Sequence, residues 1–362
     1  MIKRAILVLD DGTTYEGNAF GAESTTFGEV VFDTAMAGYQ EMLTDPSFAG
    51  QIVTPTYTII GNYGINEEVV ESRQIQVRGF AVREHCGAPS HYTSQKTIDN
   101  YLGEHNVPGI SGIDTRSLVR HIRHLGVMMG VLTSELTVGE SVRLLRSSPD
   151  YGSVDYVRKV STDKAYEWDG YGSNGGLVLV VIDGGVKFNI LRILKSLGCS
   201  VKVVPCDYRA DDILRISPDG IVISPGPGDP VLLRYMKETV SGLIGKKPVM
   251  GICLGHQILG QTMGARTFKL KFGHRGGNHP VRDLVSGRVH ITTQNHGFAI
   301  DPDTVRGGLE VSQVNLNDNT VEGLRHRSEP ILSVQYHPEA APGPQDNTYL
   351  FSEFVKLVKS QK

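Results

Sequence analysis

The sequence predicts an α/β protein in which a doubly wound, mostly parallel sheet is preceded by a separate α+β domain. Two observations predict this fold class. From residue 177 onward, short β-rich runs alternate with amphipathic helical segments, whereas the first 150 residues show no such alternation. At 362 residues the chain is also longer than one typical domain. We therefore expect domains at residues 1–150 and 177–362, joined by a connection over residues 151–176 that is rich in Tyr, Gly, Ser and Asp.

The carboxy-terminal domain begins with the apolar run Leu177–Ile182, which is typical of a buried parallel strand. Further strands are expected at residues 201–205, 220–224 and 247–252, and helices at residues 187–197, 209–216, 232–244 and 346–359. This β-α-β order indicates parallel strands, because each helix returns the chain across a face of the sheet. In such a sheet the functional residues lie at the carboxyl ends of the strands.

The amino-terminal domain has a different pattern. Ala5–Gly17 predicts two strands around an Asp-Gly turn, and residues 29–34 and 51–55 indicate further strands. A helix is expected over Thr115–His124, with Asp114 in the capping region. These patterns indicate an α+β domain but no activity.

Charge and cysteine content exclude several classes of function. The chain has 36 basic and 39 acidic side chains, well interspersed, with a net charge of −3. This balance gives no electrostatic reason to expect nucleic acid or an anionic membrane as a partner. The four cysteines show no CxxC pairing, which favours the reducing cytoplasm. The apolar run that starts at Ala5 is too short for a signal core or a membrane span.

Two absences bear on cofactors. The chain has no Gly-x4-Gly-Lys-[Ser/Thr] loop and no Gly-x-Gly-x-x-Gly motif that opens a helix, so neither common nucleotide cradle is predicted. His85, Cys86 and His91 lack a fourth ligand at similar spacing, so no metal site is expected.

The most informative motif is Gly251-Ile-Cys253-Leu254-Gly255, which joins an apolar strand to a short helix. It is the thiol counterpart of a nucleophile elbow, where a tight turn requires glycine on both sides of the nucleophile. The amino-terminal end of the helix favours the reactive thiolate. A single motif of this kind is weak, since a free cysteine more often packs as a small apolar side chain.

Two further strand ends strengthen this interpretation. Downstream, a strand pattern runs into His337-Pro-Glu339, where His337 suits a general base and Glu339 suits its orienting acceptor. Upstream, Ser-Pro-Gly226-Pro-Gly228-Asp-Pro is a rigid loop, and the Gly226 amide could pair with the Leu254 amide as an oxyanion hole. Taken alone, each has an ordinary explanation, as a backbone-bonded histidine or a turn. Together with the elbow they indicate thiol acyl transfer.

The three motifs resemble those of the class I, triad-type glutamine amidotransferases. The resemblance implies that Cys253 attacks the side-chain amide of glutamine, that His337 is the general base and acid, and that Glu339 orients His337. It also implies that the amides of Gly226 and Leu254 form the oxyanion hole. These two residues would bind glutamine together with Gly228, Gln257, Asn295, Gly297 and Phe298. The last three follow a strand pattern at 288–292, and a hairpin turn is the alternative interpretation of that stretch.

The amino-terminal domain resembles that of the carbamoyl-phosphate synthetase small subunit, in the stretches that begin at Gly28, Gly38, Ile60 and Pro108. By this resemblance Ser47 contacts the bound glutamine, although a turn serine after Asp45-Pro46 explains it equally well. The resemblance implies a large synthetase subunit as the partner. That subunit would bind ATP, magnesium and bicarbonate, so no cofactor is expected in this chain.

Three other functions are compatible with parts of the sequence. One, a cysteine peptidase on a related sheet, is disfavoured by the Asn295-His-Gly-Phe298 stretch and by the two-domain layout. A glutaminase for anthranilate, aminodeoxychorismate or guanylate synthesis would lack the 150-residue amino-terminal domain. A non-catalytic scaffold subunit would be favoured by loss of Cys253, His337 or Glu339, and all three are present. The sequence does not indicate oligomeric state, or whether the product enters pyrimidine or arginine synthesis.

Overall fold

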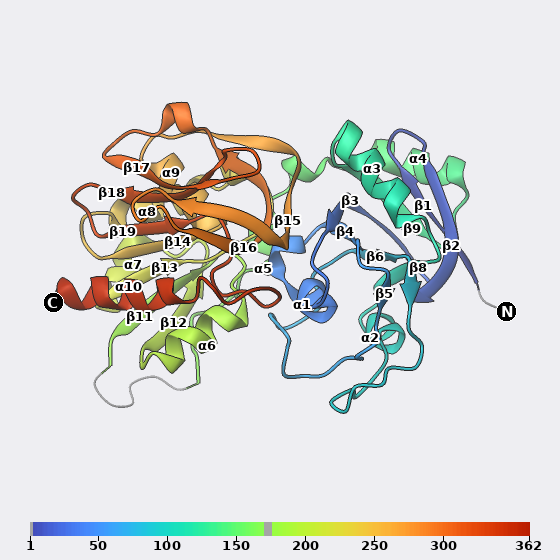
Figure 1. Ribbon diagram of the computed structural model, residues 1–362, viewed down its shortest axis with the longest axis horizontal. Coiled ribbons are helices and arrows are strands. Elements are labelled where there is room, and N and C mark those ends of the chain that lie inside the picture. Colours follow the sequence, from blue (N-terminus) through green and yellow to red (C-terminus); the bar gives the residue numbers. More distant parts are fainter. Residues whose placement is uncertain (1–2, 170–175) are drawn as a thin grey trace. The chain divides into compact units, whose positions relative to one another are not determined.

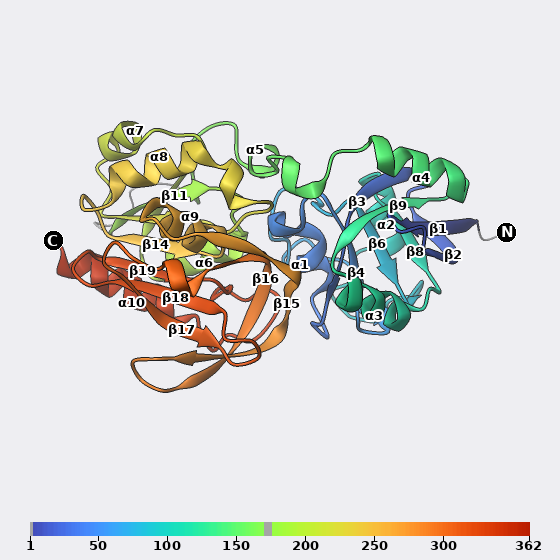
Figure 2. The same ribbon diagram turned by 90° about the horizontal axis from the view of Figure 1, so that it is seen from above.

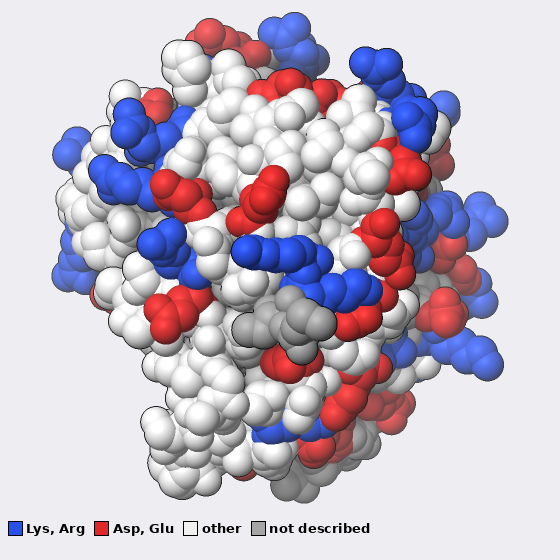
Figure 3. Space-filling model, turned by 90° about the vertical axis from the view of Figure 1, so that its right-hand side faces the viewer, with Lys and Arg blue, Asp and Glu red and all other residues white. Residues whose placement is uncertain are grey.

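The computed structural model describes residues 3–169 and 176–362 and divides into two compact units (Figure 1). The first unit comprises Met1–Val154 with Lys271–Arg275, and the second comprises Asp155–Leu270 with Gly276–Lys362. Lys and Arg side chains lie among Asp and Glu side chains over the face drawn in Figure 3, as the near-neutral composition leads one to expect. None of the helices in the described parts of the chain is both long and apolar enough to cross a membrane.

The first unit is built on a closed barrel with the strand order β1-β2-β8-β6-β4-β3-β9. Its strands are β1 Arg4–Leu9, β2 Thr14–Gly21, β3 Thr25–Asp33, β4 Gln51–Pro55, β6 Gly79–Val82, β8 Pro108–Ser111 and β9 Met128–Thr133, beside the short pair β5 Ile59–Ile60 and β7 Glu84–His85. The expected Asp-Gly hairpin is confirmed, since β1 and β2 pair antiparallel. The barrel closes where β9 pairs with both β1 and β3. Closure removes the exposed strand edges that an open sheet would present.

Four α-helices complete this unit: α1 Tyr39–Thr44, α2 Ile98–Glu104, α3 Thr115–Leu125 and α4 Val138–Ser147. Helix α3 begins where the expected helix begins and ends one residue later than expected. The Asp114 side chain accepts a hydrogen bond from the Ser117 amide, at 2.9 Å, and so caps the first turn. Leu118 and Ile122, four residues apart on one face, are buried in the barrel core.

The second unit contains a ten-stranded sheet in the order β10-β12-β11-β13-β14-β19-β18-β17-β15-β16. Its strands are β10 Tyr166–Glu167, β11 Val178–Asp183, β12 Ser200–Pro205, β13 Gly220–Ile223, β14 Val249–Ile252, β15 Thr267–Asp283, β16 Val289–Ile300, β17 Leu309–Asn315, β18 Val321–His326 and β19 Ile331–Val334. The five strands from β12 to β19 in this order are parallel. This confirms the predicted α/β class, and antiparallel strands extend the sheet on both sides.

Helices cover both faces of the parallel strands (Figure 2). They are α5 Val157–Val160, α6 Phe188–Ser196, α7 Ala210–Arg215, α8 Arg234–Leu243, α9 Leu254–Thr262 and α10 Tyr349–Ser360. Along β11 the buried side chains alternate. Leu179 and Val181 lie in the core formed with α6 and α10, whereas Val180 and Ile182 lie in the core formed with α7, α8 and α9. A strand buried on both faces has to be apolar throughout, which explains the continuous run in the sequence.

Two segments differ from the sequence-based expectations. The segment 151–176, expected as a connection, includes α5 and β10, and β10 pairs antiparallel with β12 at the edge of the sheet; residues 170–175 of this expected connection lie outside the described residues. Asn295, Gly297 and Phe298 do not form a hairpin turn, because β16 continues through them from Val289 to Ile300.

Candidate active site

Cys253 occupies the turn between β14 and α9, with φ 53° and ψ −104°. A positive φ is a strained backbone conformation for a residue with a Cβ atom. Both flanking glycines are required by contact. A Cβ atom on Gly251 would lie 2.5 Å from the Leu259 Cδ1 atom, and one on Gly255 would collide with the carbonyl oxygen of Ile223. The sequence therefore specifies glycine because the helix packs directly on the ends of β13 and β14.

The pairing of β14 with β19 places the Cys253 loop beside the segment that carries His337. The two strands are parallel, with Ile252 opposite Val334, and the Cys253 amide donates to the Val334 carbonyl at 2.9 Å. The Cys253 thiol is buried and lies 3.6 Å from the Asn295 carbonyl oxygen. The Gln335 Nε2 atom lies 3.7 Å from the same sulfur. Residues from β16 and from the segment directly after β19 thus lie beside the thiol.

His337 is held by Glu339, as the sequence predicts for a base and its orienting acceptor. The His337 Nδ1 atom lies 2.7 Å from the Glu339 Oε1 atom, and both side chains are buried. Burial lowers the pKa of His337, but the charges of Glu339 and Cys253 raise it more, so that the pKa rises from 6.5 to about 10. The imidazolium is therefore the stable form when the thiol is ionised, as an ion-pair nucleophile requires.

Lys187 is a member of this site that the sequence analysis missed. Its Nζ atom lies 3.2 Å from the Glu339 Oε1 atom, at side-chain exposures of 1% and 0%, and it also donates to the Ala340 carbonyl. Burial raises the pKa of Glu339, but the Lys187 and His337 charges lower it more, to about 2. Asn189 supports the same turn by donating to the Glu339 carbonyl at 2.6 Å. Glu339 is thereby kept ionised beside the imidazole.

The one available signal for Lys187 is its position in an apolar stretch after β11, directly before α6. A lysine there is also compatible with an exposed position at the start of a helix. Only the tertiary contact with Glu339 identifies its role.

The two predicted oxyanion-hole positions lie at the carboxyl ends of adjacent parallel strands. Gly226 follows β13, Leu254 follows β14, and Ile223 pairs with Gly251. A Cβ atom on Gly226 would lie 2.6 Å from the Leu254 Cδ2 atom and would also collide with the Gly184 carbonyl. The close approach of the two loops is therefore possible because residue 226 is glycine.

The residues predicted for the glutamine pocket belong to three segments of this unit. Gln257 is buried in α9, and its Nε2 atom donates to the Phe298 carbonyl at 2.8 Å and to the Gln335 Oε1 atom at 3.1 Å. Asn295, Gly297 and Phe298 lie close together in the second half of β16. Gly228 has a φ of 89°, a conformation that favours glycine. The Gln257 amide group thus links α9 to β16 and to the segment after β19.

Ser47 lies in the other unit, in the short 3₁₀ helix Pro46–Phe48. Its amide is bonded to the Asp45 carboxylate at 2.9 Å, as expected for a turn serine, and its hydroxyl is buried without a hydrogen-bond partner among the described residues. A contact between Ser47 and glutamine stays a prediction.

The two histidines and the cysteine between residues 85 and 91 make separate contacts. The Cys86 thiol donates to the Ala88 carbonyl at 3.4 Å, the His85 ring stacks on Phe20, and His91 bonds to Thr93.

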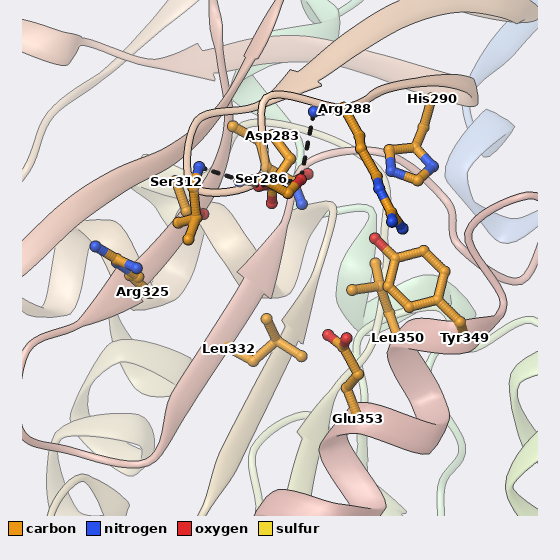
Figure 4. A pocket seen from close by; sticks show the side chains of 12 residues that line it. Asp283, Ser286, Arg288, His290, Ser312, Arg325, Leu332, Tyr349, Leu350 and Glu353 are labelled. Atoms are coloured by element: carbon orange, nitrogen blue, oxygen red, sulfur yellow. Dashed lines mark hydrogen bonds between the residues drawn. The ribbon is translucent and has the colours of Figure 1, made fainter.

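A pocket of about 460 Å³ lies elsewhere in the second unit, beside the turn after Asp283 (Figure 4). In this turn the Asp283 carboxylate accepts hydrogen bonds from the amides of Val285 and Ser286. None of its lining residues belongs to the predicted active site.

Comparison with known proteins agrees with this arrangement. Residues 180–357 match the family model for class-I glutamine amidotransferases, and residues 7–132 match that for the carbamoyl-phosphate synthase small chain domain. The carbamoyl phosphate synthase small chain of Aquifex aeolicus is 50% identical over 370 residues, covering 99% of this chain and all of that protein. This chain belongs to the carbamoyl-phosphate synthase small chain family.

Other members of the family are equally similar. The small chains of Akkermansia muciniphila and Nostoc are 49% and 50% identical and are covered over 98% and 96% of their lengths. Among solved structures, a proposed GMP synthase subunit from Thermoplasma acidophilum is 24% identical, with a TM-score of 0.47, and matches 52% of this chain and 96% of that one. The predicted membership is thus confirmed over both units, because the small-chain relatives span the whole chain.

Proposed function

We propose that this chain is the glutamine-hydrolysing subunit of a carbamoyl-phosphate synthase and that Cys253, His337 and Glu339 carry the reaction. The observation that supports this most directly is the buried chain of contacts His337–Glu339–Lys187, beside the Cys253 loop that the pairing of β14 with β19 brings next to it. The family membership of both units supports the same function.

In the proposed reaction the Cys253 thiolate attacks the side-chain carbonyl carbon of glutamine, and the carbonyl oxygen becomes an oxyanion. The amides of Gly226 and Leu254 stabilise that oxyanion by hydrogen bonds. His337, as imidazolium, donates a proton to the leaving nitrogen, so that ammonia departs and a γ-glutamyl thioester forms. His337 then removes a proton from water as the water attacks the thioester, the carbon–sulfur bond breaks, and glutamate leaves with the Cys253 thiolate and the His337 imidazolium restored.

Glu339 and Lys187 act without touching the substrate. Glu339 accepts the His337 Nδ1–H bond, which fixes the tautomer and stabilises the imidazolium. Lys187 keeps Glu339 ionised in a buried environment, where an isolated carboxylate would take up a proton.

We further propose that the ammonia passes to a large synthetase subunit that binds ATP, magnesium and bicarbonate, and that this chain holds no cofactor of its own. The two chains would form a heterodimeric unit. A cytoplasmic location is supported by four free cysteines in the structure.

The test is formation of carbamoyl phosphate from glutamine, ATP and bicarbonate by this chain mixed with the large subunit from the same source. The proposal expects product that requires both chains, disappears with Cys253→Ser and returns when ammonia is added. Hydrolysis of glutamine without any product in the mixture would show that the triad is active and that the partner is wrongly assigned.

A further inference from the structure

The first unit carries a pocket of about 630 Å³ that the proposed reaction does not use. Four arginines line it: Arg83, directly after β6, and Arg116, Arg120 and Arg123 on α3. The three on α3 follow the spacing i, i+4, i+7, which places them on one face of the helix. The opposite face, with Leu118 and Ile122, is buried in the barrel core. We call this feature the arginine pocket.

The arginine pocket carries an excess of positive charge. Among residues 3–169 and 176–362, no ion pair joins any of these four guanidinium groups to a carboxylate. Arg83 donates to the Ile113 carbonyl at 3.4 Å, and Arg123 lies 5.8 Å from the centroid of the Phe272 ring. The single carboxylate in the pocket lining, Asp114, is the cap of α3.

Two features make this arrangement unfavourable for the isolated chain. Arg116 is the second residue of α3, near the positive end of the helix dipole, where an acidic side chain would be stabilising. Arg116 and Arg120 are like charges at i, i+4, which repel each other. Since the cluster does not stabilise its own helix, its charge indicates an anionic partner.

The surroundings favour a protein over a small anion. The four arginine side chains are exposed. The segment that contributes Thr56 and Thr58 to the pocket also exposes Tyr57 and Ile59, at 44% and 43%. Exposed aromatic and aliphatic side chains beside arginines are typical of protein interfaces, where their apolar area becomes buried. A phosphate group would bind the guanidinium groups but would leave that apolar area in water.

We propose that the arginine pocket, with Tyr57 and Ile59, is a docking surface for a carboxylate-rich segment of the large synthetase subunit. This inference rests on the proposed function. Arginine suits the role because its planar guanidinium group can bind a carboxylate through two parallel hydrogen bonds.

The experiment compares three double variants of the full chain. Arg116→Glu/Arg120→Glu reverses two charges of the pocket. Arg143→Glu/Arg146→Glu makes the same change of net charge on α4, at two exposed positions outside the pocket. Arg116→Lys/Arg120→Lys keeps the charge and removes the bidentate geometry. Circular dichroism and the basal glutaminase rate of each isolated chain report whether the fold and the active site are intact.

The readout is the dissociation constant for the large subunit, measured by titration calorimetry at low and at physiological salt. We expect charge reversal in the pocket to weaken binding by about a hundredfold or more, and the lysine variant by about tenfold. The α4 control should change the constant by less than about threefold, because its charges lie outside the interface. Glutamine-dependent synthesis at limiting subunit concentration should fall in the same order, while basal glutaminase activity stays the same.

The contrary outcomes are distinguishable. If wild type binds and the charge-reversed pocket binds equally well, the docking inference is wrong and the proposed function stands. If wild type neither binds the large subunit nor supports synthesis, both are wrong. A third outcome would show a small-anion site. In that case the isolated wild-type chain binds inorganic pyrophosphate and the charge-reversed variant does not, while both bind the large subunit equally well. The docking inference would then be overturned.

Discussion

Removal of the Lys187 charge gives the sharpest test of how the active site is held. In Lys187→Met, the Glu339 carboxylate would stay buried at 0% exposure with one ionic partner fewer. Breaking a buried ion pair by deleting one member destabilises a protein by about 3–5 kcal/mol. Linkage gives a similar magnitude, since a carboxyl whose pKa falls from 4.5 to about 2 contributes about 3 kcal/mol at neutral pH. We therefore expect a loss of about 3 kcal/mol in the free energy of unfolding.

The sign of the pH dependence follows from the direction of the shift. The folded-state pKa of Glu339 is lowered, so its contribution is fully present above about pH 4.5 and is lost as the pH falls toward 2. Lys187→Met raises that pKa, so the stability of the variant should vary less with pH over this window. Urea denaturation followed by circular dichroism at several pH values measures both effects.

The matched control is the double variant Lys187→Met/Glu339→Gln. Replacing both members of a buried pair removes the unpaired charge, so the double variant should be more stable than Lys187→Met alone. Glutaminase activity should be low in both, because Lys187→Met raises the pKa of Glu339 and the double variant has no carboxylate to accept the His337 Nδ1–H bond. A loss below about 1 kcal/mol in the single variant, or a double variant less stable than the single, would refute the role assigned to Lys187.

Three further predictions concern the elbow and the base. Gly255→Ala should lower the melting temperature sharply and abolish glutamine hydrolysis, because the added Cβ atom would collide with the Ile223 carbonyl oxygen. The control is Gly87→Ala, which should change neither, since a Cβ atom there has nothing within 4 Å. Equal melting temperatures of the two variants would contradict this prediction. Cys253→Gly should abolish hydrolysis while raising the unfolding free energy by about 1 kcal/mol, since glycine relieves the positive φ; a destabilised variant in urea titration would count against strain there. For His337, whose folded pKa is raised to about 10, the stabilising contribution is fully present below about pH 6.5 and is lost as the pH rises toward 10. His337→Asn should flatten the decline of stability over that range, and an unchanged profile would argue against the pairing with Cys253 and Glu339.

Much of the fold and of the site could be predicted from local sequence. The run at β11 is apolar throughout because both of its faces are buried, and that pattern is visible without a structure. The glycines at 251 and 255 are required by contacts within the turn and its neighbouring strand, so the elbow has a local signature. The closure of the barrel is different, because it depends on β9 pairing with β1 and β3, and strand pairing over such separations has no local signal.

By itself, the sequence determined the α/β class of the second unit and the position of the Cys253 elbow, and it predicted His337 and Glu339 as the base and its acceptor. Each depends on periodicity or on a short motif, and these are properties of neighbouring residues. Only the tertiary structure decided that Lys187 is the buried counter-ion of Glu339, and that the arginines of α3 face the same pocket as Arg83. Burial and charge balance are sums over residues brought together from distant parts of the chain, so no local pattern specifies them.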